Sequence, residues 1–183
     1  MPYAIELFVD AAAEAAVREI WSALAERRIA PYLHESPSRP HVSVGVYGAL
    51  DLDAAAASLR SFAAATAPLP FTLASWGLFP SASEPVVFAA PVVTVALLAL
   101  HERACQQLAS VARGPSAYYL PGQWTPHCSL AVHFPPERAL DALEVCRALP
   151  LPLSGRFEAI GAIETGPARP LFTYPFALGA VDY

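Results

Sequence analysis

The sequence predicts an α+β protein made of two similar α/β halves of about 86 residues each. Three observations predict this fold class: strand and helix periodicities alternate along the chain, landmarks recur at a constant offset, and one short histidine motif occurs in each half. The chain has 183 residues, of which 55% are hydrophobic and 15% charged, so it can bury a sizeable core and is not intrinsically disordered. We therefore expect a single domain over residues 1–183, with repeat units at 3–91 and 92–180 that form two lobes.

The first unit is expected to run strand, helix, strand, helix and then a strand pair. Asp10 and Asp51 can each cap the helix that follows, because their side-chain oxygens accept hydrogen bonds from free backbone N–H groups. Pro31 stops the first helix, and residues 80–84, with one proline and two serines, form the turn of the strand pair. The predicted strands are 3–9, 41–47, 71–78 and 86–90, and the predicted helices run from Asp10 to about 29 and from Asp51 to before Pro68.

The second unit repeats this order. Thr94 caps a helix that is expected to end at Gly114 and Pro115, and a further helix begins at Pro136 and ends at Pro150. The predicted strands are 127–133, 157–163 and 171–176. The landmark pairs, offset by 86 residues or in the last case by 85, are His41 and His127, Ser43 and Ser129, Phe71 and Phe157, and Pro85 and Pro170.

Each half carries a Pro-His-x-Ser motif at the start of an alternating strand, His41-Val-Ser43 and His127-Cys-Ser129. Because side chains alternate faces along a strand, the histidine and serine of each motif share one face, and apolar residues occupy the other. The apolar face must meet the helices. Each His-Ser pair is therefore expected on the open face.

Strict alternation also predicts the neighbours of the two motifs. Gly45 and Ala131 leave room beside the His-Ser pairs, and Tyr47 and His133 lie further along the same faces. Tyr47 and His133 are six residues from the motif histidines, roughly 20 Å in an extended strand, so we expect neither to take part in the chemistry.

Charge and cysteine content limit the partners and the compartment. The net charge is −5 and all 11 basic residues are arginine, so we expect no long nucleic acid as a partner. Three cysteines without a CxxC or zinc spacing fit a reducing cytoplasm. The N-terminus lacks the basic start of a signal peptide, and the most apolar stretch, residues 86–100, contains Pro91 and is too short to span a bilayer. We expect a cytoplasmic monomer that does not bind membranes.

With both motifs at equivalent positions, the sequence resembles the 2H phosphoesterases, a superfamily named for two His-x-Thr/Ser motifs, and in particular the bacterial 2′-5′ RNA ligase family. The resemblance covers nearly the whole chain and implies two pseudo-symmetric lobes whose antiparallel sheets face a central cleft, with helices outside. It also implies metal-independent action on 2′,3′-cyclic phosphates or 2′,5′ linkages, with His41 and His127 as the catalytic pair and Ser43 and Ser129 as phosphate-binding hydroxyls. Threonine is usual where this chain has serine, which keeps the hydroxyl and loses only a methyl group.

This assignment agrees with the chemistry of the residues. In-line opening of a cyclic phosphodiester needs a base at the attacking oxygen and an acid at the leaving oxygen. Histidine suits both roles because its ordinary pKa of about 6.5 populates both protonation states near neutral pH. The serine hydroxyls can donate to the non-bridging oxygens. The sequence shows neither a carboxylate cluster nor an HExxH pattern, so we predict no metal and no cofactor.

Four further residues are candidates for substrate binding. Arg39 precedes the first motif, where a guanidinium could bind phosphate or remain solvated. Tyr118, Tyr119 and Trp124 cluster in the loop before the second motif, where aromatic rings could stack on a nucleobase or pack beneath the loop.

We expect a phosphodiesterase for short RNA ends or small cyclic nucleotides, with 2′,5′ ligation as the reverse direction. Either histidine could be the base. Two alternatives stay open: a non-catalytic RNA- or nucleotide-binding module on the same scaffold, and a phosphodiesterase of a small non-RNA cyclic phosphate metabolite.

Overall fold

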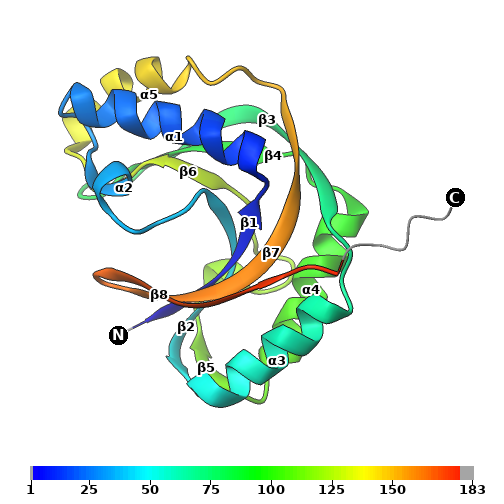
Figure 1. The fold of residues 1–183 in the computed structure, drawn as a ribbon. Coiled ribbons are helices and arrows are strands. Elements are labelled where there is room, and N and C mark those ends of the chain that lie inside the picture. The colour runs from blue at the N-terminus through cyan, green and yellow to red at the C-terminus, as the bar shows by residue number, and fades with distance from the viewer. Residues whose placement is uncertain (1, 178–183) are drawn as a thin grey trace, which may run out of the picture.

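A computed structural model describes residues 2–177 and contains one eight-stranded sheet in the order β5-β2-β1-β7-β3-β4-β6, with β8 paired to β7 (Figure 1). Every strand pairing within it is antiparallel, which confirms the predicted α+β class. The strands are β1 (Tyr3–Val9), β2 (His41–Leu50), β3 (Leu69–Phe79), β4 (Val86–Pro91), β5 (Ala112–Pro115), β6 (Cys128–Ala131), β7 (Leu153–Thr165) and β8 (Ala168–Pro175). The helices are α1 (Ala11–Glu26), α2 (Tyr32–Glu35), α3 (Leu52–Ala64), α4 (Val95–Leu108) and α5 (Ala139–Cys146), with 3-10 turns η1 (Ala117–Tyr119) and η2 (Pro136–Arg138).

The two halves of the chain interleave in this sheet. β1 pairs with the first motif strand, β2, and β4 pairs with the second motif strand, β6. β4 therefore has the same position next to the second motif strand that β1 has next to the first. The strands β3 and β7, which follow the second helix of each half, are exchanged between the halves. β7 pairs with β1, β3 pairs with β4, and β3 and β7 pair with each other. The sequence repeat had suggested that residues 3–91 and 92–180 each form a sheet of their own. Within the described residues, strands of both units belong instead to one sheet. The offset between Pro85 and Pro170 likewise matches strands in different places, since β4 lies inside the sheet whereas β8 lies off the main strand order and pairs with β7.

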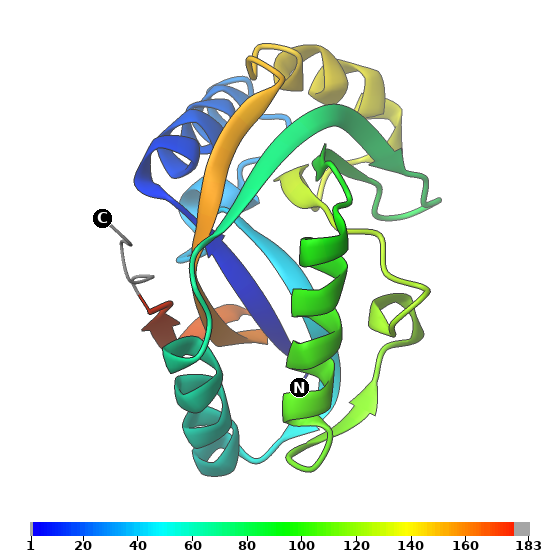
Figure 2. The ribbon, with the colours of Figure 1, turned by 90° about the vertical axis from the view of Figure 1, so that its right-hand side faces the viewer.

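Helices cover the sheet at its two ends (Figures 1 and 2). α1 lies with α5 and contacts β6, whereas α4 lies with α3 and contacts β2. Each long helix thus packs on the motif strand of the other half. The predicted caps are confirmed, because the side chains of Asp10, Asp51 and Thr94 each accept a hydrogen bond from the backbone N–H three residues ahead.

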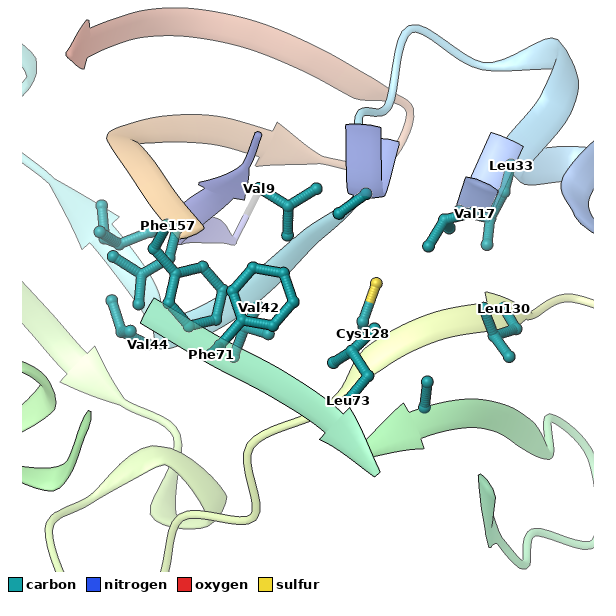
Figure 3. Close-up of a cluster of buried hydrophobic side chains, with 14 of the residues drawn as sticks. Val9, Val17, Leu33, Val42, Val44, Phe71, Leu73, Cys128, Leu130 and Phe157 are labelled. Carbon is teal, nitrogen blue, oxygen red and sulfur yellow. The ribbon is translucent and has the colours of Figure 1, made fainter. Parts of the chain in front are cut away.

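One apolar core runs through both halves (Figure 3). Phe71 of β3 and Phe157 of β7 pack with ring centroids 4.6 Å apart. Val42 of β2 lies beside them, and Cys128 and Leu130 of β6 continue the same cluster. The apolar faces of both motif strands therefore enter the core, as predicted, and the histidines and serines take the opposite face.

Two differences from the predicted boundaries affect the motif strands. α4 ends at Leu108, well before Gly114, and residues Ala112–Pro115 form β5 instead, which pairs with β2. This pairing satisfies backbone groups along the β2 edge. β6 covers only Cys128–Ala131, because His133 has a φ of 52° that ends the extended conformation before it. Among the helices of the described chain, none is long and apolar enough to cross a membrane.

Candidate active site

The sheet curves so that the two motif strands meet, although four strands lie between them in the sheet order. β2 and β6 are in contact. His41 is the first residue of β2, and His127 immediately precedes β6. Burial lowers the pKa of the His127 imidazole, and the nearby charge of His41 lowers it further. We therefore assign the two imidazoles to one candidate site.

Both motif histidines are held in the same way. The Nδ1 atom of His41 lies 2.6 Å from the carbonyl oxygen of Arg39, and that of His127 lies 2.8 Å from the carbonyl oxygen of Thr125. A carbonyl can only accept, so Nδ1 carries the proton of the neutral ring and Nε2 carries the lone pair. Each carbonyl is two residues before its histidine, across the motif proline, which keeps the preceding backbone extended. Ser43 and Ser129 are partly exposed, like the histidines, whereas the residues between and after them are buried.

The alternation of faces in β2 does not extend past the first motif. The register of β1 against β2 shifts at Val44, which leaves one extra residue on β2. This bulge places Ser43 and Gly45 on opposite faces, and Gly45 lies opposite the core residue Ile5. Tyr47 is buried as well, and it lines a pocket with Gly45 and with Cys105 of α4. The prediction that Gly45 and Tyr47 share the motif face is therefore wrong.

Two indole rings anchor the motif strands at equivalent points. Trp21 of α1 donates from Nε1 to the carbonyl oxygen of Ser129 at 3.1 Å, and Trp124 donates to the carbonyl oxygen of Ser43 at 2.9 Å. Trp124 is also stacked on His101 of α4, with ring centroids 4.0 Å apart. Since Trp124 is only 9% exposed, its ring is not available to a nucleobase. It packs beneath the loop, which is the alternative that the sequence left open.

A pocket of about 440 Å³ opens beside His127. Tyr118 and Tyr119 line it, together with Phe79 from β3 and the side chain of Gln123. The Tyr118 side chain is exposed, and Phe79 packs edge-on against His127 with centroids 4.8 Å apart. Of the three aromatic candidates in this loop, the two tyrosines thus lie at the site.

Arg39 is already engaged by protein groups. Its Nη2 atom lies 2.8 Å from the Glu14 carboxylate of α1, and the guanidinium lies 4.7 Å from the centroid of the Phe8 ring. It flanks His41 through its backbone and points to Glu14 with its side chain. A direct role in binding phosphate would require this ion pair to open.

Glu6 is an ionisable group of the site that the sequence motifs did not indicate. It lies on β1, is 2% exposed, and its Oε1 atom is 3.2 Å from Nε2 of His41. Burial raises the pKa of Glu6 to about 8 against the opposing charge of Arg39, and burial lowers the pKa of His41. One signal was present in the sequence: an acid stands alone between Ile5 and Leu7 in an apolar strand, and such residues are almost never buried without a partner.

No group of three or more His, Cys, Asp or Glu side chains within residues 2–177 is arranged to hold a metal ion. The absence of a metal from the mechanism stays a prediction.

The sequence profile of the 2′-5′ RNA ligase superfamily matches residues 8–167, a span that includes both histidine motifs. The chain belongs to this superfamily. The resemblance to the 2H phosphoesterases is thereby confirmed, and membership of the 2′-5′ RNA ligase superfamily supports a phosphoesterase-type enzyme. Curated proteins provide no match to the chain.

Solved structures share the fold over nearly the whole chain. TT0787 of Thermus thermophilus aligns with a TM-score of 0.66 and 19% identity over 98% of this chain and 100% of its own. E. coli LigT complexed with 3′-AMP aligns with a TM-score of 0.59 and 15% identity, over 97% and 99%. Kluyveromyces marxianus Usb1 aligns with a TM-score of 0.53 and 12% identity, over 96% and 98%. These likenesses establish the fold.

Proposed function

We propose that the protein is a metal-independent phosphodiesterase that opens 2′,3′-cyclic phosphates or cleaves 2′,5′ linkages in short RNA or nucleotides. His41 and His127 act as its acid–base pair, and the hydroxyls of Ser43 and Ser129 bind the phosphate. One observation carries the proposal: two imidazoles in one site each bind a backbone carbonyl through Nδ1. Both rings therefore direct the same atom, Nε2, away from the backbone that holds them.

The electrostatics of the pair suit this role. One histidine must accept a proton while the other donates one, so the pair works with a single proton. The charge of His41 lowers the pKa of His127, which disfavours the doubly protonated state. Burial lowers the pKa of both rings. We therefore expect a bell-shaped pH profile of kcat/KM with its maximum on the acidic side of neutrality.

The pocket beside His127 is proposed to hold the nucleobase. Tyr118 and Tyr119 offer aromatic faces, and His127 is the only basic side chain among its lining residues within the described chain. A pocket with so little charge favours a single nucleotide or a short end over a long polyanion. Base–aromatic stacking contributes about 1–3 kcal/mol, so a Tyr118→Ala variant should raise KM by roughly five- to 150-fold, and Tyr118→Phe should restore it.

The decisive experiment is hydrolysis of the four 2′,3′-cyclic nucleoside monophosphates and of 2′,5′-linked dinucleotides, with the position of the product phosphate determined. His41→Ala and His127→Ala should each lower kcat by about 10²–10⁴-fold, in buffers with or without chelator. His34→Ala, which removes an exposed histidine of α2, is the matched control and should retain activity.

Each other outcome has a distinct meaning. Full activity in either motif variant would refute the two-histidine mechanism. Nucleotide binding without turnover of either substrate would indicate the non-catalytic binding module. Turnover confined to a cyclic phosphate that is not a nucleotide would indicate the metabolite enzyme.

A further inference from the structure

The Glu6 carboxyl lies beside Nε2 of His41, the ring nitrogen of this histidine that is not bound to the backbone. Glu6 is opposite Ser43 in the pairing of β1 with β2, so both side chains lie on the motif face. Its Oε1 atom is 3.2 Å from Nε2 of His41, and the side chain is almost fully buried. The Nδ1 atom of His41 is already bound to the Arg39 carbonyl. A phosphate oxygen that approaches Nε2 therefore also approaches the Glu6 carboxyl.

Few charged groups face Glu6. His41 faces it from β2, and the charge of Arg39, in the loop before β2, acts on it. The Tyr119 phenol of η1 lies near enough for the Glu6 charge to raise its pKa, after the larger effect of burial. On the β7 side Glu6 is paired with Gly161. A cavity of about 40 Å³ also adjoins Glu6, and Arg39 is its only other ionisable lining residue within the described chain.

At 3.2 Å, Oε1 of Glu6 and Nε2 of His41 are close enough to share one proton. When His41 is neutral, Nε2 can only accept, so the carboxyl must carry the proton. When the imidazole is charged, it donates to the carboxylate. In both states the pair holds one proton and is neutral overall. Removing that proton leaves a buried carboxylate beside a neutral ring, and the nearest guanidinium, that of Arg39, is already paired with Glu14.

We propose, on the basis of the function proposed above, that Glu6 is a positioning residue whose shared proton holds the His41 ring and admits anionic phosphate, and that loss of this proton closes the site. A protonated carboxyl donates to the ring or to a phosphate oxygen, whereas a carboxylate repels the phosphate at the same distance. The buried position of Glu6 favours the protonated form at neutral pH and ionisation at mildly alkaline pH.

The test measures how affinity for 3′-AMP changes with pH, by isothermal titration calorimetry at pH 7 and pH 9. Because a phosphate monoester has a second pKa of about 6, the charge of this probe is nearly constant over the interval. With a pKa of about 8, Glu6 is protonated in roughly one molecule in eleven at pH 9, so the Kd should rise about tenfold.

Glu6→Gln keeps the shape of the protonated side chain and cannot ionise, so its Kd should change by less than about twofold over the same interval. Glu19→Gln is the matched control. It removes an exposed carboxylate of α1, and it should keep the tenfold change. Circular dichroism spectra of both variants establish that they are folded.

An equal pH dependence in wild type and Glu6→Gln would overturn the proposal. A second measurement does not need the ligand. The ring-nitrogen chemical shifts of His41, followed by NMR from pH 5 to 10, should show an inflection at about pH 8 that reports the ionisation of Glu6. Glu6→Gln should lack this inflection, and His127 serves as the internal reference. If 3′-AMP failed to bind at every pH while this inflection was present, the proposed function would be refuted and the Glu6–His41 proton would stand. If the inflection were absent from wild type, the shared proton would be refuted whatever the enzyme's activity.

Discussion

The hydrogen bond from Trp124 to Ser43 predicts that a Trp124→Phe variant is less stable and binds substrate more weakly. Phenylalanine keeps an aromatic ring against His101, which the indole now contacts at a centroid distance of 4.0 Å. It has no N–H, so the Ser43 carbonyl loses a donor at 2.9 Å. Removing the partner of a buried polar group costs about 1–3 kcal/mol. For a chain of this length that corresponds to a fall in Tm of roughly 2–12 °C.

The assay is urea unfolding followed by circular dichroism, since the substitution itself alters tryptophan fluorescence. We expect a lower midpoint with an unchanged m-value, because the surface exposed on unfolding hardly changes. Trp21→Phe is the matched variant, since it removes the equivalent 3.1 Å bond to the Ser129 carbonyl, and its loss should be similar. KM for a cyclic nucleotide should rise in both variants as the serine hydroxyls become less well placed. A Trp124→Phe protein whose free energy of unfolding lies within about 0.5 kcal/mol of wild type would refute this account of how β2 is anchored.

Three other outcomes follow from the structure. Asp10 accepts hydrogen bonds from the backbone N–H groups of Ala13 and Arg156, at 3.0 and 2.6 Å, so Asp10→Ala should cost about 1–2 kcal/mol in urea unfolding and Asp10→Asn less. Burial raises the pKa of Cys128 and of Cys146 to about 12, so mass spectrometry should find both thiols unmodified after brief iodoacetamide treatment of the native protein and modified after unfolding. Burial also raises the pKa of Glu6 from 4.5 to about 8, so the folded state binds more protons than the unfolded state across this window. Wild type should therefore lose stability relative to Glu6→Gln as the pH rises from about 4.5 to 8, and parallel pH–stability curves would contradict the raised pKa.

Local features of this chain were predictable because their causes lie within a few residues. The cap at Asp10 depends on backbone groups three positions ahead, and the opposed faces of His41 and Val42 follow from the geometry of any strand. The faces of Gly45 and Tyr47 were mispredicted because the bulge at Val44 depends on how β2 pairs with β1, which no local pattern of β2 encodes.

The candidate site divides in the same way. The His-x-Ser motifs were identified from residue types and spacing, but the burial of Trp124 depends on His101 of α4, which lies 23 positions before it in the chain. The contact of Glu6 with His41 likewise joins β1 to β2 across α1. Neither pairing leaves a periodic signal, since each involves a single residue on each side.

The sequence alone determined the classes of chemistry available to this protein: two histidines and two serines on strands whose other faces are apolar, an acidic chain, and helices with their own caps. The tertiary structure decided how these parts meet. It exchanged β3 and β7 between the halves, brought β2 and β6 together from distant places in the sheet, and buried Glu6 against His41. The physical reason is that capping and alternation depend on short-range backbone geometry, whereas strand partners, register and the desolvation that shifts a pKa depend on which surfaces pack together.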